Sequence, residues 1–177
     1  HFDSHTDTWD QYWGMKYTHG TPFRRAVEEG CLIPEKTIQV GLRGPLYTPG
    51  DIDDSRDLGF EVVTAFDIHR KGIEYTCEKI RKTVGETPVF VTFDIDFLDP
   101  AYAPGTGTPE VGGFSTWEAM ELIKGSFKDL NIVGFDLVEV LPYKDLCDST
   151  AFAASGIIFE FISQIAQNAK LKDGVNI

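Results

Sequence analysis

The sequence predicts an α/β domain built on a parallel sheet. Four short runs rich in β-branched and aromatic residues are typical of strands, and they alternate with segments whose apolar residues recur at helical spacing. Three apolar runs also end in the same dipeptide, Phe-Asp. Strands that alternate with helices favour a parallel sheet with right-handed crossovers. Ligands bind such sheets at the carboxyl ends of the strands, which is where these aspartates are expected.

The elements can be placed from their residue patterns. The predicted strands are residues 37–42, 60–64, 89–93 and 131–135, and the last two have the continuous apolar pattern of strands buried on both faces. Helical spacing covers residues 72–84, 116–127 and about 150–169. Ser115 and Glu118 predict a capping box for the second helix. The third is apolar around much of its surface, so we expect it to pack against the sheet or a neighbouring subunit.

Composition narrows the class of protein. The 177 residues suit one domain, and 42% hydrophobic residues are enough for a real core. A formal net charge of -12 argues against a nucleic-acid binder. No uninterrupted apolar run approaches the roughly 18 residues that span a bilayer, so no membrane partner is expected. Three widely spaced cysteines form no disulfide pattern, and a reducing, cytoplasmic location is expected.

Residues 1–7 have the character of a strand end that runs into a functional loop. A domain rarely begins in this way. We therefore expect the chain to be the C-terminal part of a longer protein, with the N-terminal strands of the sheet missing from it.

The aspartates indicate a metal site. Asp3, His5 and Asp7 alternate, so in extended backbone all three side chains face one side, and Asp94 and Asp96 repeat that geometry. Four carboxylates packed together repel one another unless a cation offsets them. Two divalent ions that share carboxylates resolve the conflict, and this donor set suits Mn²⁺ better than zinc. Either motif alone is more often a solvated turn; their combination at strand ends favours the metal site.

Three motifs carry a resemblance to a known family. HFDSHTDTWD, FDIDFLDPAYAPGTGTPEVGG and GFDLVEVLPYKD resemble the ureohydrolases, which include arginases and agmatinases, and the likeness is closest to agmatinase. It covers nearly the whole chain, so residues 1–177 are expected to be the C-terminal part of a single ureohydrolase domain. The resemblance implies a three-layer α/β/α fold with a parallel sheet, two Mn²⁺ per subunit in the full-length protein, and a homo-trimer or homo-hexamer.

The resemblance also assigns the metal ligands. It implies that Asp3 and Asp94 bridge the two ions, that Asp7 completes the shell of the first ion, and that His5 and Asp96 hold the second. The family's remaining ligand is a histidine in a Gly-Gly-Asp-His segment, which this sequence does not contain.

Two other histidines are not expected to bind metal. His1 is not the match of the missing histidine and is expected to point elsewhere, because it falls one residue before Phe2. His69, in a predicted loop, is expected to be a surface histidine.

Further residues match the family's catalytic groups. His19 matches the proton-relay histidine, and Glu139 matches the glutamate that pairs with the guanidinium of the substrate. Asp7 is the candidate to carry a proton to the departing amine. Asp136 is expected to brace the site, and the Pro- and Gly-rich residues 100–113 to form a rigid loop beside the metals.

The resemblance implies a binuclear manganese hydrolase that cleaves a guanidino compound, with agmatine giving urea and putrescine. The alternatives are a guanidinobutyrase or other guanidino-acid hydrolase, a formimidoyl-group hydrolase, and a non-catalytic member of the fold. Arginine is disfavoured, because Trp9 and the region of Lys16 replace the residues with which arginases hold the amino-acid head group.

Two sets of residues bear on the choice of substrate. Trp9, with Tyr12 and Trp13, could line an aromatic entrance for the distal ammonium of agmatine, although plain packing of a loop explains these residues equally well. A guanidino acid would instead need a cation for its carboxylate, and Lys16, Arg24 and Arg43 are the candidates.

Overall fold

The computed structural model describes residues 1–44 and 48–172. It contains four strands in two parallel pairs: β1 (Ile38–Leu42) pairs with β2 (Glu61–Thr64), and β3 (Pro88–Asp94) pairs with β4 (Asn131–Val138). The four predicted strands are therefore confirmed, as is their parallel direction.

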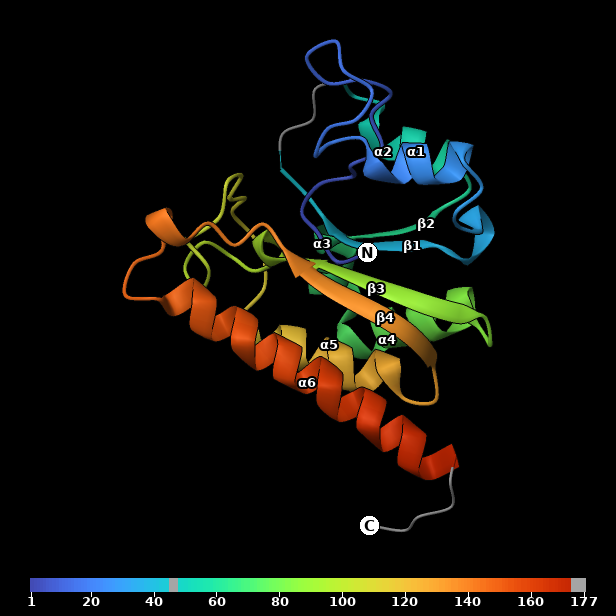
Figure 1. Cartoon of the computed structure of the whole chain (residues 1–177), viewed down its shortest axis with the longest axis vertical. Helices are drawn as coiled ribbons and strands as arrows, with labels where there is room; N and C mark the ends of the chain where they lie inside the picture. The colour runs from blue at the N-terminus through green and yellow to red at the C-terminus, as the bar shows by residue number, and fades with distance from the viewer. Residues whose placement is uncertain (45–47, 173–177) are drawn as a thin grey trace.

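Phe2 joins the two pairs of strands. It forms parallel bridges to Val40 of β1 and to Phe93 of β3, and its backbone accepts a hydrogen bond of 2.8 Å from the amide of Asp94. The Phe2 ring is buried against Phe93 and Phe97. The N-terminal end of the chain therefore lies in the middle of the strands, between β1 and β3 (Figure 1).

Helices lie on both sides of the strands. In Figure 1, α1 (Pro22–Glu28) and α2 (Asp51–Asp57) lie on one side, and α5 (Thr116–Phe127) and α6 (Ser149–Lys172) lie on the other. The remaining helices are α3 (Ala65–Lys71) and α4 (Ile73–Val84). Short 3-10 turns cover Pro34–Lys36, Ile95–Phe97 and Pro142–Lys144.

The three predicted helices correspond to α4, α5 and α6, and the capping box of Ser115 and Glu118 is present. Three helices of seven residues were not predicted, because two turns are too short to show a periodic pattern. One of them corrects the placement of His69, which lies in α3 and not in a loop. A capping box of Thr64 and Asp67 begins that helix. His69 is exposed, as expected.

Strand β4 differs from its prediction in length and burial. It continues to Val138, so Phe135-Asp136 lies inside the strand and not at its end. Val133 of β4 is 64% exposed and Phe90 of β3 is 59% exposed, so neither strand is buried on both faces. Among the described residues β4 pairs with β3 alone, which leaves it at an edge.

Helix α6 contains no uninterrupted apolar run of about 18 residues, but its averaged composition is apolar. Averaged over residues 149–169 its mean hydropathy is 1.3, so the helix is long and apolar enough to cross a membrane by length and composition. One face of the helix packs into the core, whereas Phe152 and Phe159 on the helix are exposed. Ile157 and Phe161 are fully buried, and the Phe161 ring contacts the rings of Phe93 and Phe127. The predicted packing against the sheet is thus confirmed.

Candidate metal centre

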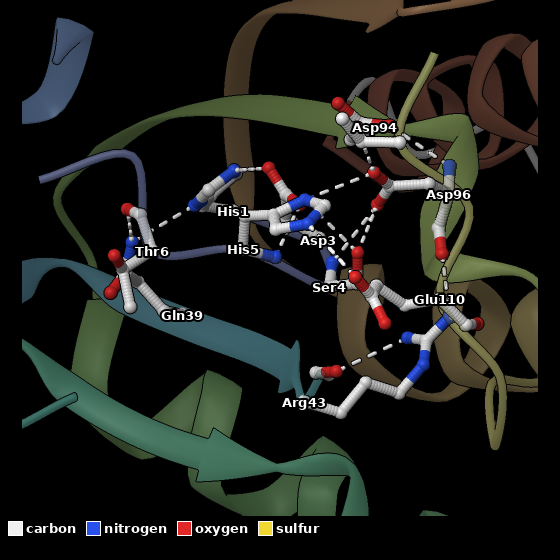
Figure 2. A network of polar contacts seen from close by, with 12 residues as sticks. His1, Asp3, Ser4, His5, Thr6, Gln39, Arg43, Asp94, Asp96 and Glu110 are labelled. Atoms are coloured by element: carbon white, nitrogen blue, oxygen red, sulfur yellow. Dashed lines mark hydrogen bonds and ion pairs between the residues drawn. The ribbon is translucent and has the colours of Figure 1, made fainter. Parts of the chain in front are cut away.

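The candidate centre lies where Phe2 and β3 end side by side. Because Phe2 bridges β1 and β3, the next residue, Asp3, emerges beside Asp94 at the end of β3. The amide of Asp3 donates to the carbonyl of Val40 at 3.1 Å, which fixes the backbone at this point. Asp3, Asp94 and Asp96 are all buried, and Figure 2 shows the two motifs facing each other.

Asp3 belongs to two groups of possible metal ligands. One group is His1, Asp3 and Asp7, and the other is Asp3, His5 and Asp96; within each group the ligand atoms lie within 4.8 Å of one another. Oδ1 of Asp3 lies 3.4 Å from Nδ1 of His5, which lies 3.1 Å from Oδ2 of Asp96. The structure thus brings together four of the five predicted ligands around a shared aspartate.

Asp94, the fifth predicted ligand, lies beside these groups but belongs to neither. Its Oδ1 accepts a 2.9 Å hydrogen bond from the amide of Asp96 and so begins the 3-10 turn that follows β3. Burial, and then the charges of Asp3 and Asp96, raise the pKa of Asp94 to about 10. That shift places Asp94 in the same electrostatic cluster as the other carboxylates.

The charges at this site are not balanced by protein groups alone. Burial, followed by the charge of Asp3, raises the pKa of Asp7 well above its usual range. Burial lowers the pKa of His5, but its hydrogen bonds to Asp3 and Asp96 outweigh this and raise the pKa to about 11. Burial raises the pKa of Asp3, and the charge and hydrogen bonds of His1 and His5 overcome it, so that the pKa falls below its usual range. Buried carboxylates that hold protons are ligands from which a divalent cation displaces protons.

His1 corrects an expectation from the sequence. Its Nε2 lies 2.7 Å from Oδ2 of Asp3, so the ring points into the site and not elsewhere. Nδ1 of His1 accepts from Nε2 of Gln39 at 3.0 Å, which orients the ring (Figure 2). Alternation along the strand was the signal: His1 is two residues before Asp3 and shares its face.

Other residues at the site were missed. The Ser4 hydroxyl donates to Oδ1 of Asp96 at 2.7 Å, and Thr108 donates to Oδ2 of Asp96 at 3.3 Å. Glu110 places Oε1 3.8 Å from Nε2 of His5. Thr108 and Glu110 belong to the loop that was predicted beside the metals. Thr108 contacts Asp96, 12 residues away, and Glu110 contacts His5, about a hundred residues away. No local pattern indicates either side-chain direction.

Glu139 follows β4 and lies within electrostatic range of Asp7, because its charge contributes to the raised pKa of Asp7. Both residues have left-handed backbone, with φ of 64° at Glu139 and 51° at Asp7. Non-glycine residues in this region are strained, and such strain gathers at functional sites. A Cβ on Gly107 would lie 3.7 Å from Oε2 of Glu139, so the rigid loop borders this carboxylate. For Asp136 the structure gives no bracing contact: its buried Oδ1 has no hydrogen-bond partner among the described residues.

His19 and Trp9 lie in an aromatic cluster outside the polar network. The His19 ring lies 5.3 Å from the ring of Tyr12, and Tyr12 stacks on Trp13 at 4.3 Å and packs 5.1 Å from Trp9. Nε1 of Trp9 donates to Asp51 at 3.2 Å. The predicted aromatic residues therefore contact one another, and the hydrogen bond to Asp51 holds Trp9 in place.

The sequence of this chain is similar to those of known proteins. A profile of the arginase family matches residues 1–163. The chain belongs to the arginase family. It is 46% identical over 170 residues to guanidinopropionase of Pseudomonas aeruginosa, covering 96% of this chain and 53% of the relative. It is 47% identical over 162 residues to mitochondrial agmatinase of Gallus gallus, covering 92% of this chain and 47% of the relative.

The fold agrees with this assignment. The structure matches proclavaminate amidino hydrolase from Streptomyces clavuligerus with a TM-score of 0.89 and 41% identity, over 95% of this chain and 56% of that chain. The arginase-like α/β fold with a parallel sheet is therefore confirmed. The chain spans about half the length of the relatives that it matches.

Lys16, Arg24 and Arg43 were the candidate partners for a substrate carboxylate. Two of these side chains already donate hydrogen bonds to backbone carbonyls. Nε of Arg24 donates to the carbonyl of Thr8 at 2.7 Å. The Arg43 guanidinium donates to several carbonyls, among them that of Asp96 at 2.6 Å. Lys16, the third, is exposed.

Proposed function

We propose that this chain carries the metal centre and the guanidinium-binding carboxylate of a hydrolase that cleaves a guanidino compound and releases urea. The observation that carries the proposal is the shared Asp3, which belongs to two groups of ligand-type side chains at the carboxyl end of the parallel strands. Membership in the arginase family and the names of its relatives support the reaction class.

The residues fit a pair of Mn²⁺ ions. The donor set is rich in carboxylates with imidazole nitrogens, and oxygen and imidazole ligands suit manganese. Two of the carboxyl groups, those of Asp7 and Asp94, have raised pKa values that a cation would reverse. Asp3, Asp94 and Asp7 are assigned to one ion, and Asp3, Asp94, His5 and Asp96 to the other. When bound, such ions supply activated water near neutral pH.

The chain's own residues position the substrate and move protons. Glu139 binds the guanidinium, because a carboxylate and a planar guanidinium form two parallel hydrogen bonds. Asp7 lies within electrostatic range of Glu139 and has a raised pKa, which suits a group that carries a proton to the departing amine. The exposed His19 exchanges protons with solvent. Trp9 lies at the base of the aromatic cluster that faces the distal end of the substrate.

Agmatine is the substrate that these contacts favour. A guanidino acid needs a cation for its carboxylate. Arg43 and Nε of Arg24 are already engaged with carbonyl oxygens, which leaves the exposed Lys16 as the remaining candidate of the three. Agmatine instead ends in an ammonium group, which the faces of Trp9, Tyr12 and Trp13 attract by cation–π interaction. A trimer or hexamer and a cytoplasmic location stay predictions.

Urea release tests the proposal. The purified protein with Mn²⁺ is assayed on agmatine, 4-guanidinobutyrate, 3-guanidinopropionate and arginine, with D94N as the inactive variant and D54N, an exposed change on α2, as its matched control. Urea and putrescine from agmatine, lost in D94N and kept in D54N, support the proposal. Preference for a guanidino acid overturns the choice of substrate. Failure on all four compounds overturns the ureohydrolase function. Formamide release from an N-formimidoyl amino acid, assayed separately, would then indicate a formimidoyl-group hydrolase.

A further inference from the structure

Arg43 follows strand β1 and turns its guanidinium into the loop that contains Glu110. It donates to the carbonyl oxygens of Asp96 at 2.6 Å, Glu110 at 2.9 Å and Leu98 at 3.2 Å. Weaker contacts at 3.3 Å reach the carbonyls of Gly41 and Val111. One side chain thus holds three segments together: the end of β1, the turn after β3, and the far end of the loop.

Glycine gives the guanidinium room to approach. A Cβ on Gly113 would collide with the Arg43 guanidinium and with the backbone of Leu98 and Asp99. The Arg43 contacts fix the backbone of Glu110 relative to that of Asp96, although 13 residues lie between them. The Arg43 contacts therefore place the backbone from which the Glu110 side chain extends.

The Glu110 carboxylate is aimed at His5. Its Oε1 lies 3.8 Å from Nε2 of His5, the ring nitrogen opposite to the one that faces Asp3 and Asp96. Gly44 leaves the space that this side chain occupies, since a Cβ there would lie 2.6 Å from Cδ of Glu110. Within the described part of the chain, His5 is the ion-pair partner of Glu110 (Figure 2).

A histidine that binds a metal through one ring nitrogen usually donates its other N–H to a carboxylate, which fixes the tautomer and the ring direction. We infer that Glu110 is a positioning residue for His5: its carboxylate pairs with the Nε2 side of the ring, 3.8 Å away, and so presents Nδ1 to the ion shared with Asp96. Arg43 holds Glu110 in place for this role. The inference rests on the proposed metal centre and adds two residues to which no role at that centre was assigned.

The test is a Mn²⁺ titration of the purified full chain, in which electron paramagnetic resonance measures the free ion. Three variants are compared with the wild type: E110Q, R43K, and E78Q as a matched control on the exposed side of α4. R43K keeps the charge but cannot span the same carbonyls. Thermal unfolding of each variant without metal is measured in parallel.

In E110Q and R43K we expect one of two bound ions to weaken by about 10–100-fold, while the other ion and the unfolding temperature of E110Q stay as in the wild type. E78Q is expected to bind both ions normally. Normal binding of both ions by E110Q overturns the inference and leaves the proposed metal centre standing. A wild-type protein that binds no Mn²⁺ overturns the metal centre itself, and the inference with it.

Discussion

The hydroxyl of Ser4 donates a 2.7 Å hydrogen bond to Oδ1 of Asp96, 92 residues further along the chain. The Ser4 amide donates to the same oxygen at 3.1 Å. Both motifs of the candidate centre are therefore joined directly, independently of any ion. The other oxygen of Asp96, Oδ2, accepts from Thr108 and faces His5.

Ser4→Ala is expected to weaken the ion held by His5 and Asp96 by about 10-fold, because outer hydrogen bonds orient metal-binding carboxylates. The amide contact remains, so a larger loss is not expected. Mn²⁺ titration measures the change. Ser163→Ala, a half-buried serine on α6 whose hydroxyl bonds to Phe159 of its own helix, is the control. Unchanged affinity in Ser4→Ala would contradict the orienting role.

Replacing Asp3 and replacing Asp96 are expected to remove different numbers of Mn²⁺ ions. Asp3→Asn is expected to remove both Mn²⁺ ions, because Asp3 belongs to both ligand groups, whereas Asp96→Asn should remove one. The number of ions retained after gel filtration is measured by elemental analysis. Two ions in Asp3→Asn, or none in Asp96→Asn, would sink the two-ion assignment.

The metal-free protein is expected to lose stability as pH rises from about 6 to 9. The pKa of Asp94 is raised from 3.8 to about 10, and the pKa of His5 is raised from 6.5 to about 11. Each group therefore holds a proton in the folded state that it loses on unfolding. The folded state then binds more protons, so the free energy of unfolding falls by about 1.4 kcal/mol per pH unit for each group. Urea unfolding at several pH values measures the slope. With Mn²⁺ the slope should flatten or reverse, because the ions displace these protons.

Glu139 provides a test of strained backbone. At φ of 64°, glycine is easier to accommodate than alanine. Glu139→Gly is therefore expected to be more stable than Glu139→Ala by about 1 kcal/mol, while both lose urea release. Chemical unfolding and the urea assay measure the two effects. Equal stability of the two variants would mean that this backbone conformation carries no cost.

Phe2 is expected to be a stability residue as well as a bridge. Phe2→Ala should lower the free energy of unfolding by about 3–5 kcal/mol, as buried phenylalanine truncations do. Phe90→Ala is the control, because Phe90 is 59% exposed on β3. A similar cost for both variants would show that the centre of the sheet does not depend on Phe2.

The strands, and the grouping of the predicted ligands His5, Asp7 and Asp96 around Asp3, were predictable because their signals are local. β-branched runs identified β1 to β4, and alternation placed Asp3, His5 and Asp7 on one face. His1 had the same signal, since alternation also covers it. The edge position of β4 and the short helices carried no comparable pattern.

The surroundings of the site could not be predicted, because they depend on tertiary contacts. The contact of Glu110 with His5 joins residues far apart in sequence, and the contacts of Arg43 with Asp96 and Glu110 span 53 and 67 residues. The sequence does not show whether the side chain of a lysine or arginine already donates hydrogen bonds to backbone carbonyl oxygens. Arg43 was a candidate for a substrate carboxylate for this reason, and the structure gives it a different set of partners.

The bridge at Phe2 has a consequence for protein turnover in a cell. An apolar cleft lined by Val40, Val91 and Phe127 lies between β1 and β3, next to Phe2. A molecule in which Phe2 has come away from its two partners exposes two strand edges and this cleft together, and these are features that cause aggregation. The same event separates Asp3 from Asp94. We therefore expect chains that have lost the metal centre in this way to be substrates of chaperones and proteases.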